Sequence, residues 1–150
     1  MSIESEVSLR EITADNWYEC CQLSLTEEQQ QFVEPNSLSI AQSKYEPTLR
    51  SRAIYLRQDL VGFLMYNTGP EELGGHWIYR LMIDSRHQRK GIAKQALRLA
   101  IEEIAAIPNC KRIVAGYRAE NIAARALYET LGFEDRGDRF GKEIAVVLDL

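Results

Sequence analysis

The spacing of hydrophobic residues predicts strands and helices in alternation along the chain. Apolar and polar residues alternate over residues 7–12, and apolar runs over residues 53–56 and 61–66 flank a polar turn. These segments are expected to form a half-buried strand and a hairpin. A further strand is expected over His76–Ile83, followed through a basic turn by an amphipathic helix over about residues 90–106.

Capping and helix-breaking residues predict the other helices. Polar residues 13–16 precede a short helix through Leu23, and residues 26–29 have the form of a capping box. The capping box is expected to begin a brief helical segment, which Pro35 interrupts. A further helix is expected over residues 37–45, ending before Pro47. A last helix over residues 123–131 follows a strand over residues 112–117, with Gly132 as its C-terminal cap.

The C-terminal part is expected to be extended from Phe133 onward, with a turn at Gly137-Asp138 and a strand over residues 144–148. The order of elements predicts an α/β fold with a mixed, mostly antiparallel central sheet of about six to seven strands. About four helices should cover both faces of this sheet. Residues 1–150 are expected to form a single domain.

Composition and charge narrow the possible partners. The chain is 45% hydrophobic and 27% charged with a net charge of -4, which is typical of a globular protein and unfavourable for nucleic-acid binding. No apolar run has the length of a membrane span, and the first six residues lack a leader pattern, so we expect a cytoplasmic protein without a membrane partner. The three cysteines and two histidines have no metal-ligand spacing, so no metal site is expected.

The stretch from Arg80 to Leu97 carries the strongest chemical signal. Its apolar strand runs through a basic turn directly into a helix, whose first N–H groups have no partner inside the helix and can bind anions. Four basic side chains surround this helix start, namely Arg86, Arg89, Lys90 and Lys94. An ordinary strand-turn-helix connection, whose basic side chains are only solvated and bind no anion, is an equally good interpretation of these residues. The motifs of triphosphate loops and dinucleotide folds are absent from the sequence.

Two motifs, in this order and separated by a strand, resemble the signatures of the Gcn5-related N-acetyltransferase (GNAT) superfamily. Residues 88–93 match the acetyl-CoA signature: Gln or Arg, two residues, Gly, one residue, then Gly or Ala. Residues 121–133 match the second signature, with Asn, Ala, Leu-Tyr and Leu-Gly-Phe at the expected intervals. Segments 32–37 and 77–84 look most like bacterial spermine/spermidine (diamine) acetyltransferases of the BltD type, through a shorter match.

The resemblance implies that acetyl-CoA is the cosubstrate and that its pyrophosphate lies on the backbone of residues 89–93. The pantetheine arm would pair with the splayed strand, and Asn121 would hold the arm, cap the following helix, or do both. A side chain at Gly91 would keep the phosphates away from the backbone. The implied cofactor-binding residues are Leu81, Met82, Ile83, Gln88, Arg89, Lys90, Gly91, Ile92, Ala93, Lys94, Asn121 and Arg125.

Tyr128 corresponds to the tyrosine that usually faces the thioester sulfur in this superfamily, and would act as general acid. A core aromatic beside Leu131 and Phe133 is the other interpretation. Many relatives carry a glutamate as general base on the strand before the cofactor loop, but residues 76–83 contain no carboxylate. A water chain, Tyr79 or a carboxylate from elsewhere stays open as the base.

The expected acceptor is a primary amine that attacks directly in a ternary complex, and the sub-family resemblance points to a polyamine such as spermidine or spermine. A polyamine site needs carboxylates and aromatic faces. The candidate substrate-binding residues are Glu34, Glu46, Trp77 and Tyr79, each of which can also be an ordinary surface residue. The alternatives are another small amine, a protein N-terminus, or a non-catalytic acyl-CoA sensor. A homodimer is a further expectation, because dimers are common in the superfamily.

Overall fold

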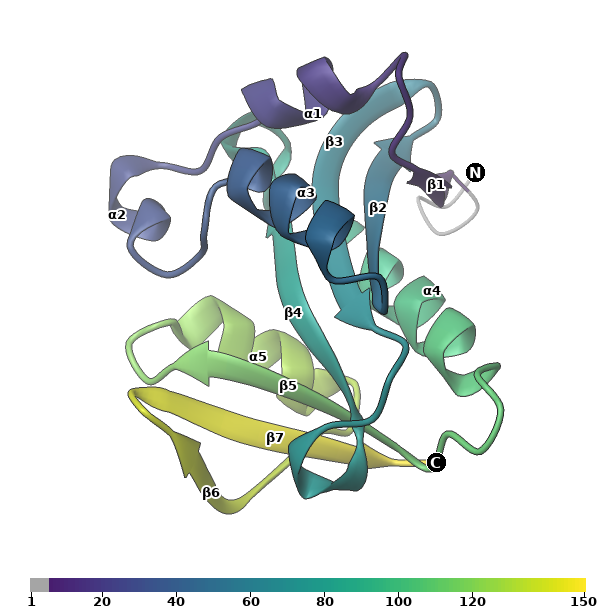
Figure 1. The fold of residues 1–150 in the computed structure, drawn as a ribbon. Helices are drawn as coiled ribbons and strands as arrows, with labels where there is room; N and C mark the ends of the chain where they lie inside the picture. The colour runs from purple at the N-terminus through teal and green to yellow at the C-terminus, as the bar shows by residue number, and fades with distance from the viewer. Residues whose placement is uncertain (1–5) are drawn as a thin grey trace.

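A seven-stranded sheet in the order β1-β2-β3-β4-β5-β7-β6 forms the centre of the computed structural model, which describes residues 6–150 (Figure 1). The first five residues, where the sequence predicted no leader, lie outside the described part. The strands are β1 (Val7–Glu11), β2 (Leu49–Leu56), β3 (Asp59–Asn67), β4 (His76–Ile83), β5 (Arg112–Arg118), β6 (Glu134–Phe140) and β7 (Glu143–Asp149). Among these strands of residues 6–150, only β4 and β5 pair in parallel, so the prediction of a mixed, mostly antiparallel sheet is confirmed.

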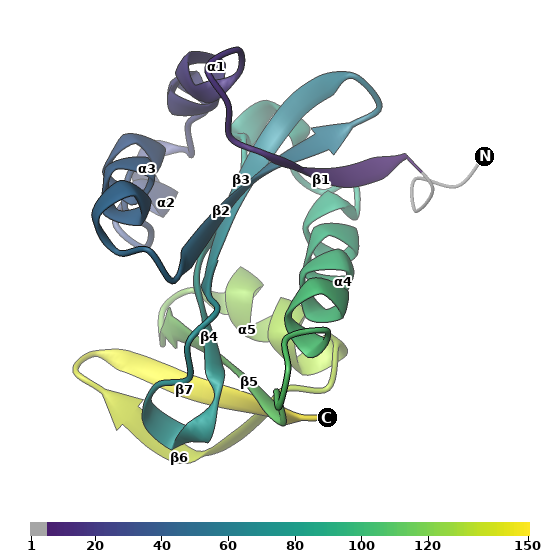
Figure 2. The ribbon, with the colours of Figure 1, turned by 45° about the vertical axis from the view of Figure 1, so that its right-hand side comes forward.

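Helices cover both faces of the sheet, as predicted (Figure 2). The helices α1 (Trp17–Gln22), α2 (Glu27–Gln30) and α3 (Asn36–Tyr45) lie on one face, and α4 (Ile92–Ala105) and α5 (Ile122–Thr130) lie on the other. About four helices were expected, and residues 6–150 contain five α-helices. The additional helix is α2, a single turn that begins at the predicted capping box of Thr26 and Gln29. Within residues 6–150, no helix is long and apolar enough to span a membrane.

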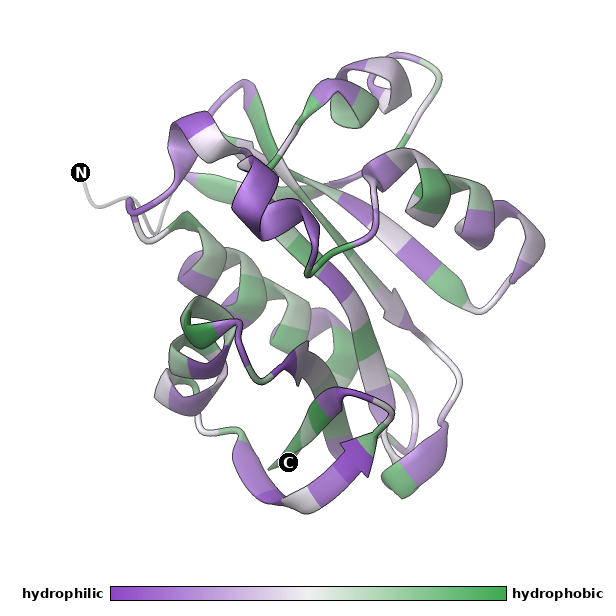
Figure 3. Cartoon of the chain, turned by 90° about the vertical axis from the view of Figure 1, so that its left-hand side faces the viewer, coloured by the Kyte–Doolittle hydropathy of each residue, from purple (hydrophilic) through white to green (hydrophobic). Residues whose placement is uncertain are grey.

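Two main hydrophobic clusters hold the helices onto the sheet. The larger cluster joins the apolar face of α4, which includes Leu97 and Ile104, to strand residues such as Leu64 and Ile113. The smaller cluster lies under α1 and around the buried Phe63. Hydrophobic residues accordingly concentrate on the central strands and on the helices that cover them (Figure 3). Burial of this apolar surface is the main source of stability and fixes the positions of the loops around the sheet.

The sheet is open between β4 and β5 over half of their length. Only His76–Ile78 of β4 pair with β5, and the two strands then diverge (Figure 1). The Asp84 N–H donates to the Val61 carbonyl of β3 at 2.8 Å, and hydrogen-bonding direction alternates along a strand, so the backbone of Leu81 and Ile83 faces the opening. The Met82 carbonyl faces β3 instead. The end of β4 therefore presents backbone groups that have no strand partner on this side.

The turn predicted at Gly137-Asp138 is wrong. Gly137, with φ 98°, lies within β6 at the shift in register between Asp135 and Arg139, so its left-handed conformation makes a bulge rather than the turn. The turn between β6 and β7 consists of Gly141, with φ 60°, and Lys142. As a result Glu143 follows the turn directly as the first residue of β7.

Candidate active site

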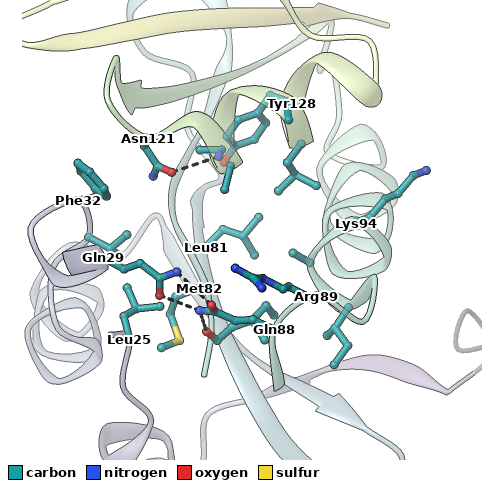
Figure 4. Close-up of a pocket in the computed structure, with 18 of the residues that line it drawn as sticks. Leu25, Gln29, Phe32, Leu81, Met82, Gln88, Arg89, Lys94, Asn121 and Tyr128 are labelled. Atoms are coloured by element: carbon teal, nitrogen blue, oxygen red, sulfur yellow. Dashed lines mark hydrogen bonds between the residues drawn. The ribbon is translucent and has the colours of Figure 1, made fainter. Parts of the chain in front are cut away.

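A cavity of about 550 Å³ lies at the N-terminal ends of α4 and α5, between α2 and β4; we call it the α4–α5 cavity (Figure 4). Ten of the residues predicted to bind the cofactor line it: Leu81, Met82, Ile83, Gln88, Arg89, Gly91, Ile92, Ala93, Lys94 and Asn121. Lys90 and Arg125 do not. Lys90 is exposed in the turn, and Arg125 pairs with Glu129 at 2.9 Å on the outer side of α5. Leu25, Phe32 and Val33, which were not among the predicted cofactor-binding residues, close the opposite wall.

The basic turn before α4 is held by two left-handed residues, Arg89 with φ 65° and Gly91 with φ 81°. Gly91 is the N-cap residue, so α4 begins at Ile92, two residues later than predicted. A Cβ on Gly91 would meet no atom within 4 Å, so the conformation of the backbone, rather than crowding by the protein, is what favours glycine here. The first N–H groups of α4 have no acceptor within the helix and open toward the cavity, together with the cationic Arg89 and Lys94.

Two glutamine side chains bridge the cavity. Gln29 of α2 and Gln88 of the basic turn donate to each other's amide oxygens at 3.0 and 2.9 Å, and Gln88 also donates to the Ile83 carbonyl at 2.9 Å (Figure 4). Sequence analysis missed Gln29 because it lies 59 residues from its partner. This pair joins the helical segment on one face of the sheet to the turn that begins α4.

A buried carboxylate fixes the same two segments. Asp84 is 1% exposed and accepts hydrogen bonds from the Ser24 N–H at 2.9 Å and from the N–H and Nε of Arg86. Burial alone would raise the pKa of Asp84, but the hydrogen bonds from Arg86 and Ser24 outweigh it, and the pKa is lowered. Asp84 is therefore charged at neutral pH and ties the connection between α1 and α2 to the end of β4.

Tyr128 of α5 is 6% exposed and contributes to both packing and the cavity. Its ring stacks on Tyr117 at 6.1 Å and meets Phe133 edge-on at 5.2 Å, as the core-aromatic interpretation expects. Its phenol lines the cavity, and no residue within 6–150 forms a hydrogen bond with it. Burial, and then the charge of Glu143, raises the pKa of Tyr128 above its ordinary value. The ring is thus packed in the core while the hydroxyl opens into the cavity, where a ligand can accept its proton.

Asn121 caps α5, as the sequence predicted. Its side-chain oxygen accepts a hydrogen bond from the Ala124 N–H at 3.2 Å. Its side chain also lines the α4–α5 cavity opposite the Gln29–Gln88 pair (Figure 4). The cap uses only the side-chain oxygen, so the side-chain N–H groups stay available to a ligand in the cavity.

A second cavity of about 530 Å³ lies between residues 30–35, β4, the end of β5 and the turn from β6 to β7; we call it the hairpin cavity. It shares six lining residues with the α4–α5 cavity: Phe32, Val33, Leu81, Asn121, Ala124 and Tyr128. The two cavities therefore meet beside Tyr128, at the opening between β4 and β5.

Two of the four predicted substrate-binding residues lie in the hairpin cavity, and two lie outside it. Glu34 and Tyr79 line the hairpin cavity, whereas Glu46 and Trp77 do not. Glu46 is exposed at the end of α3. Trp77 packs on Phe140 at 5.1 Å and donates from its ring to the backbone.

The phenol of Tyr79 donates to both carboxylate oxygens of Glu71 at 2.8 Å. Burial, and then this hydrogen bond, raises the pKa of Tyr79 to about 12. Tyr79 therefore keeps its proton at neutral pH, which removes it from the candidates for a general base.

Charged groups of both signs line the hairpin cavity: Glu34 and Glu143 are negative, and Arg80, Arg118 and Lys142 are positive. Arg80 donates to the Tyr79 carbonyl at 2.9 Å, but its buried Nε has no partner, and no carboxylate of the described chain pairs with it. Arg118 lies 3.6 Å from Glu120. The sequence did not indicate Arg118, Lys142 or Glu143, because they follow no motif.

The arrangement suits group transfer between two bound molecules. A helix N-terminus with basic side chains binds phosphate, an open strand edge pairs with an extended amide chain, and a buried phenol donates a proton between the two cavities. A donor in one cavity and an acceptor in the other would meet at Tyr128.

Comparisons with known proteins agree with this geometry. Residues 7–133 match the model of the acetyltransferase (GNAT) family. A spermine/spermidine N(1)-acetyltransferase of Bacillus subtilis (strain 168) is 31% identical over 150 residues, covering 96% of this chain and 99% of that protein.

Two solved structures share the fold. A spermidine N-acetyltransferase from Vibrio cholerae in complex with CoA and spermine has a TM-score of 0.76 at 18% identity, covering 97% of this chain and 96% of that one. An acetyl transferase from Salmonella typhimurium that modifies the N-terminal serine of a 50S ribosomal subunit protein has a TM-score of 0.73 at 16% identity, covering 97% and 96%. Together with the match over residues 7–133, these findings show that the chain belongs to the acetyltransferase (GNAT) family.

Proposed function

We propose that this protein transfers an acetyl group from acetyl-CoA to a primary amine of a polyamine such as spermidine or spermine, by direct attack in a ternary complex. One observation carries the proposal: the partnerless phenol of Tyr128 lies where the α4–α5 cavity meets the hairpin cavity. An enzyme of this kind needs a proton donor between two substrates that enter separately.

The residues of the α4–α5 cavity fit acetyl-CoA, which supplies the activated acetyl group when bound. We assign its pyrophosphate to the N-terminus of α4, where Arg89 and Lys94 add positive charge to the unpaired N–H groups. We assign the pantetheine arm to the open edge of β4, at the backbone of Leu81 and Ile83. Met82 contributes its side chain, because its carbonyl faces β3, 2.5 Å from where a Cβ on Gly62 would lie.

Tyr128 would serve the departure of coenzyme A. Attack on the thioester carbonyl creates a tetrahedral oxyanion, and breaking the carbon–sulfur bond places negative charge on sulfur. The raised pKa keeps the Tyr128 phenol protonated at neutral pH, so it can donate to that sulfur.

The polyamine assignment rests on the Bacillus subtilis relative and on the hairpin cavity. That relative, similar over nearly its full length, acts on spermine and spermidine by its name. In the cavity, Glu34 and Glu143 supply negative charge and Phe140 supplies an aromatic face, which are the groups that hold ammonium ions.

The charge of Arg80 supports a second candidate, an amine that carries a carboxylate, such as an amino acid or the N-terminal residue of a protein. Arg80 lies in the hairpin cavity without a carboxylate from residues 6–150 to pair with it. A planar guanidinium binds a carboxylate through two parallel hydrogen bonds.

A panel of amines with acetyl-CoA, followed by product mass and thiol release, tests both candidates. We expect spermidine and spermine to exceed monoamines and amino acids in kcat/KM by at least about tenfold, a difference of ~1.4 kcal/mol in transition-state binding. A preference for amino acids or a peptide N-terminus would select the second candidate. Binding of acetyl-CoA without thiol release for any amine would favour the acyl-CoA sensor.

A further inference from the structure

We propose that Glu143 is the general base that removes a proton from the acceptor amine. The inference rests on the proposed amine acetylation. An alkyl ammonium has a pKa of about 10 and must lose a proton before its nitrogen can attack. The strand that precedes the cofactor loop offers no carboxylate for this step, and Tyr79 keeps its own proton.

The turn between β6 and β7 places Glu143 at the cavity. Glu143 lies directly opposite Arg118 of β5, and its carboxylate extends over Gly116. A Cβ added to Gly116 would lie 3.5 Å from Oε2 of Glu143, an ordinary van der Waals contact, so the carboxylate lies directly over the backbone at position 116. Gly116 and Glu143 both line the hairpin cavity.

Glu143 and Tyr128 approach the opening from opposite faces of the sheet. Tyr117 and Ile144 are register partners, and both pack in the cluster that contains Tyr128. Because successive residues of a strand point to opposite faces, Gly116 and Glu143 face the other side. Direct attack needs a base beside the incoming amine and an acid beside the departing sulfur, and these two positions fall in different cavities here.

The other carboxylates nearby are less suited. Glu71 accepts hydrogen bonds from Tyr79 and from Asn67, so it is already occupied. Glu34 lines the hairpin cavity from the segment of residues 30–35, whereas Glu143 extends over Gly116 and its charge contributes to the raised pKa of the Tyr128 phenol.

The Glu143 carboxylate has no hydrogen bond or ion pair with the rest of the described chain. The charged and titratable groups that share its cavity are Arg80, Arg118, Lys142, Glu34, Tyr79, Tyr117 and Tyr128. Arg118, its register partner, lies nearest to Glu120. The Glu143 carboxylate therefore has no fixed partner, and it lies on the exposed rim, where solvent can accept a proton from it.

The proton balance is complete with these two residues. Glu143 takes one proton from the ammonium, and the freed nitrogen lone pair forms the new bond to the thioester carbonyl carbon. The carbon–sulfur bond then breaks as Tyr128 gives its proton to sulfur, and the second nitrogen proton, acidic in the tetrahedral adduct, restores the phenol. Glu143 releases its proton to solvent. The products are the amide, coenzyme A thiol and one proton.

The test is the variant Glu143→Gln, which keeps size and removes the base. We expect kcat for spermidine at neutral pH to fall by about 10²-fold, while calorimetry shows coenzyme A affinity within about twofold of wild type. The wild-type rate should level off well below the pKa of the amine. The variant rate should keep rising about tenfold per pH unit toward pH ~10, because only the neutral amine remains reactive. A weakly basic amine that is already neutral at the assay pH should lose no more than about fivefold.

Three further variants make the result specific. Glu134→Gln is the matched control on the same hairpin, since it removes only an exposed ion pair with Arg136, at 3.2 Å, and should keep the wild-type pH profile. Glu34→Gln should raise KM and keep the profile. Glu143→Asp should retain the plateau at a reduced rate, which also guards against a folding defect in the glutamine variant.

Two results would overturn the assignment of Glu143: an unchanged pH plateau in Glu143→Gln, or an equal loss of rate for strongly and weakly basic amines. In either case the role of Glu143 would be structural. If wild-type protein acetylates no amine, the proposed function fails instead, so the two failures are distinguishable.

Discussion

The two cavities that meet at Tyr128 are built in different ways. The α4–α5 cavity is lined by three segments, and the contiguous stretch from Leu81 to Lys94 supplies its backbone groups, at the turn before α4 and at the open edge of β4. The hairpin cavity depends on side chains from five separate segments, and Arg80, Glu34 and Glu143 come from three of them. A backbone site tolerates many changes of side chain, whereas a side-chain site changes its chemistry with each substitution.

Under the proposed function, this contrast would explain how one fold serves different acceptors. The turn before α4 keeps its shape as long as glycine holds position 91, so the donor side can stay constant. The acceptor side has no such requirement. Substitutions in the α4–α5 cavity should therefore affect every amine equally, and substitutions in the hairpin cavity should change the preference among amines.

The largest expected effect is that of Tyr128→Phe, at the point where the cavities meet. Loss of the phenol proton should lower kcat by about 10²-fold for every amine, and coenzyme A affinity should stay within about twofold. Steady-state rates with two chemically different amines measure this. Tyr18→Phe, at a 65% exposed position of α1, is the control. A loss confined to one amine would assign Tyr128 to the acceptor side.

The next effect is that of Gly91→Val, on the donor side alone. A branched side chain at φ 81° strains the turn by ~1–2 kcal/mol and moves the N–H groups of α4, so coenzyme A should bind about tenfold more weakly. The ranking of amines should not change. Calorimetry with coenzyme A and the amine panel measure both quantities.

Gly137→Val is the matched control for this backbone effect. Its φ of 98° imposes similar strain, but in β6 and outside both cavities, so it should destabilise the protein and leave coenzyme A affinity unchanged. A comparable loss of affinity in both variants would mean that global destabilisation, rather than the turn, governs binding.

A smaller effect is expected from Arg80→Gln, on the acceptor side. Arg80 has no carboxylate partner within residues 6–150, so its positive charge repels the ammonium groups of spermidine. Removing this partly screened repulsion should favour spermidine binding by ~1 kcal/mol. KM for spermidine should then fall about fivefold, while coenzyme A affinity stays constant. Arg50→Gln, at an exposed position of β2, should change neither quantity. A higher KM for amino acids in Arg80→Gln would instead support an acceptor that carries a carboxylate.

The smallest effect concerns Tyr66, which lies outside both cavities and donates to Glu103 at 2.7 Å. Burial, and then this hydrogen bond, raises the pKa of Tyr66 from 10.0 to about 12. The stabilisation is therefore complete below pH 10 and is lost as the pH rises through about 12. Tyr66→Phe should lower the free energy of unfolding by ~1 kcal/mol at pH 8, a difference that shrinks above pH 10 in urea titrations. A constant difference up to pH 12 would contradict this pKa.

Local sequence signals predicted the features that depend on local structure. The amphipathic pattern gave α4, the Asn121 side chain caps α5 as expected, and a glycine marks the left-handed residue before α4. Features that depend on long-range contacts were not predictable in this way. Gln29 meets Gln88 across 59 residues, and only the folded sheet shows that Trp77 packs outside the cavity that Tyr79 lines.

Glu143 shows most clearly why part of the site escaped prediction. Asp and Gly favour turns, so Gly137-Asp138 is a reasonable turn from its residues, but the register with β7 makes Gly137 a bulge and moves the turn to Gly141. The shift by four residues carries Glu143 into the hairpin cavity. No pattern within β6 or β7 alone contains this information.

The incomplete pairing of β4 and β5 has a consequence for the stability of the protein when no acetyl donor is bound. Each protein molecule without a donor has a length of β4 that lacks a strand partner, and an unpaired edge pairs with another chain wherever it becomes accessible. A bound donor covers this edge and also favours the folded state by mass action. The supply of acetyl donor would then govern how long the protein survives as well as how fast it works.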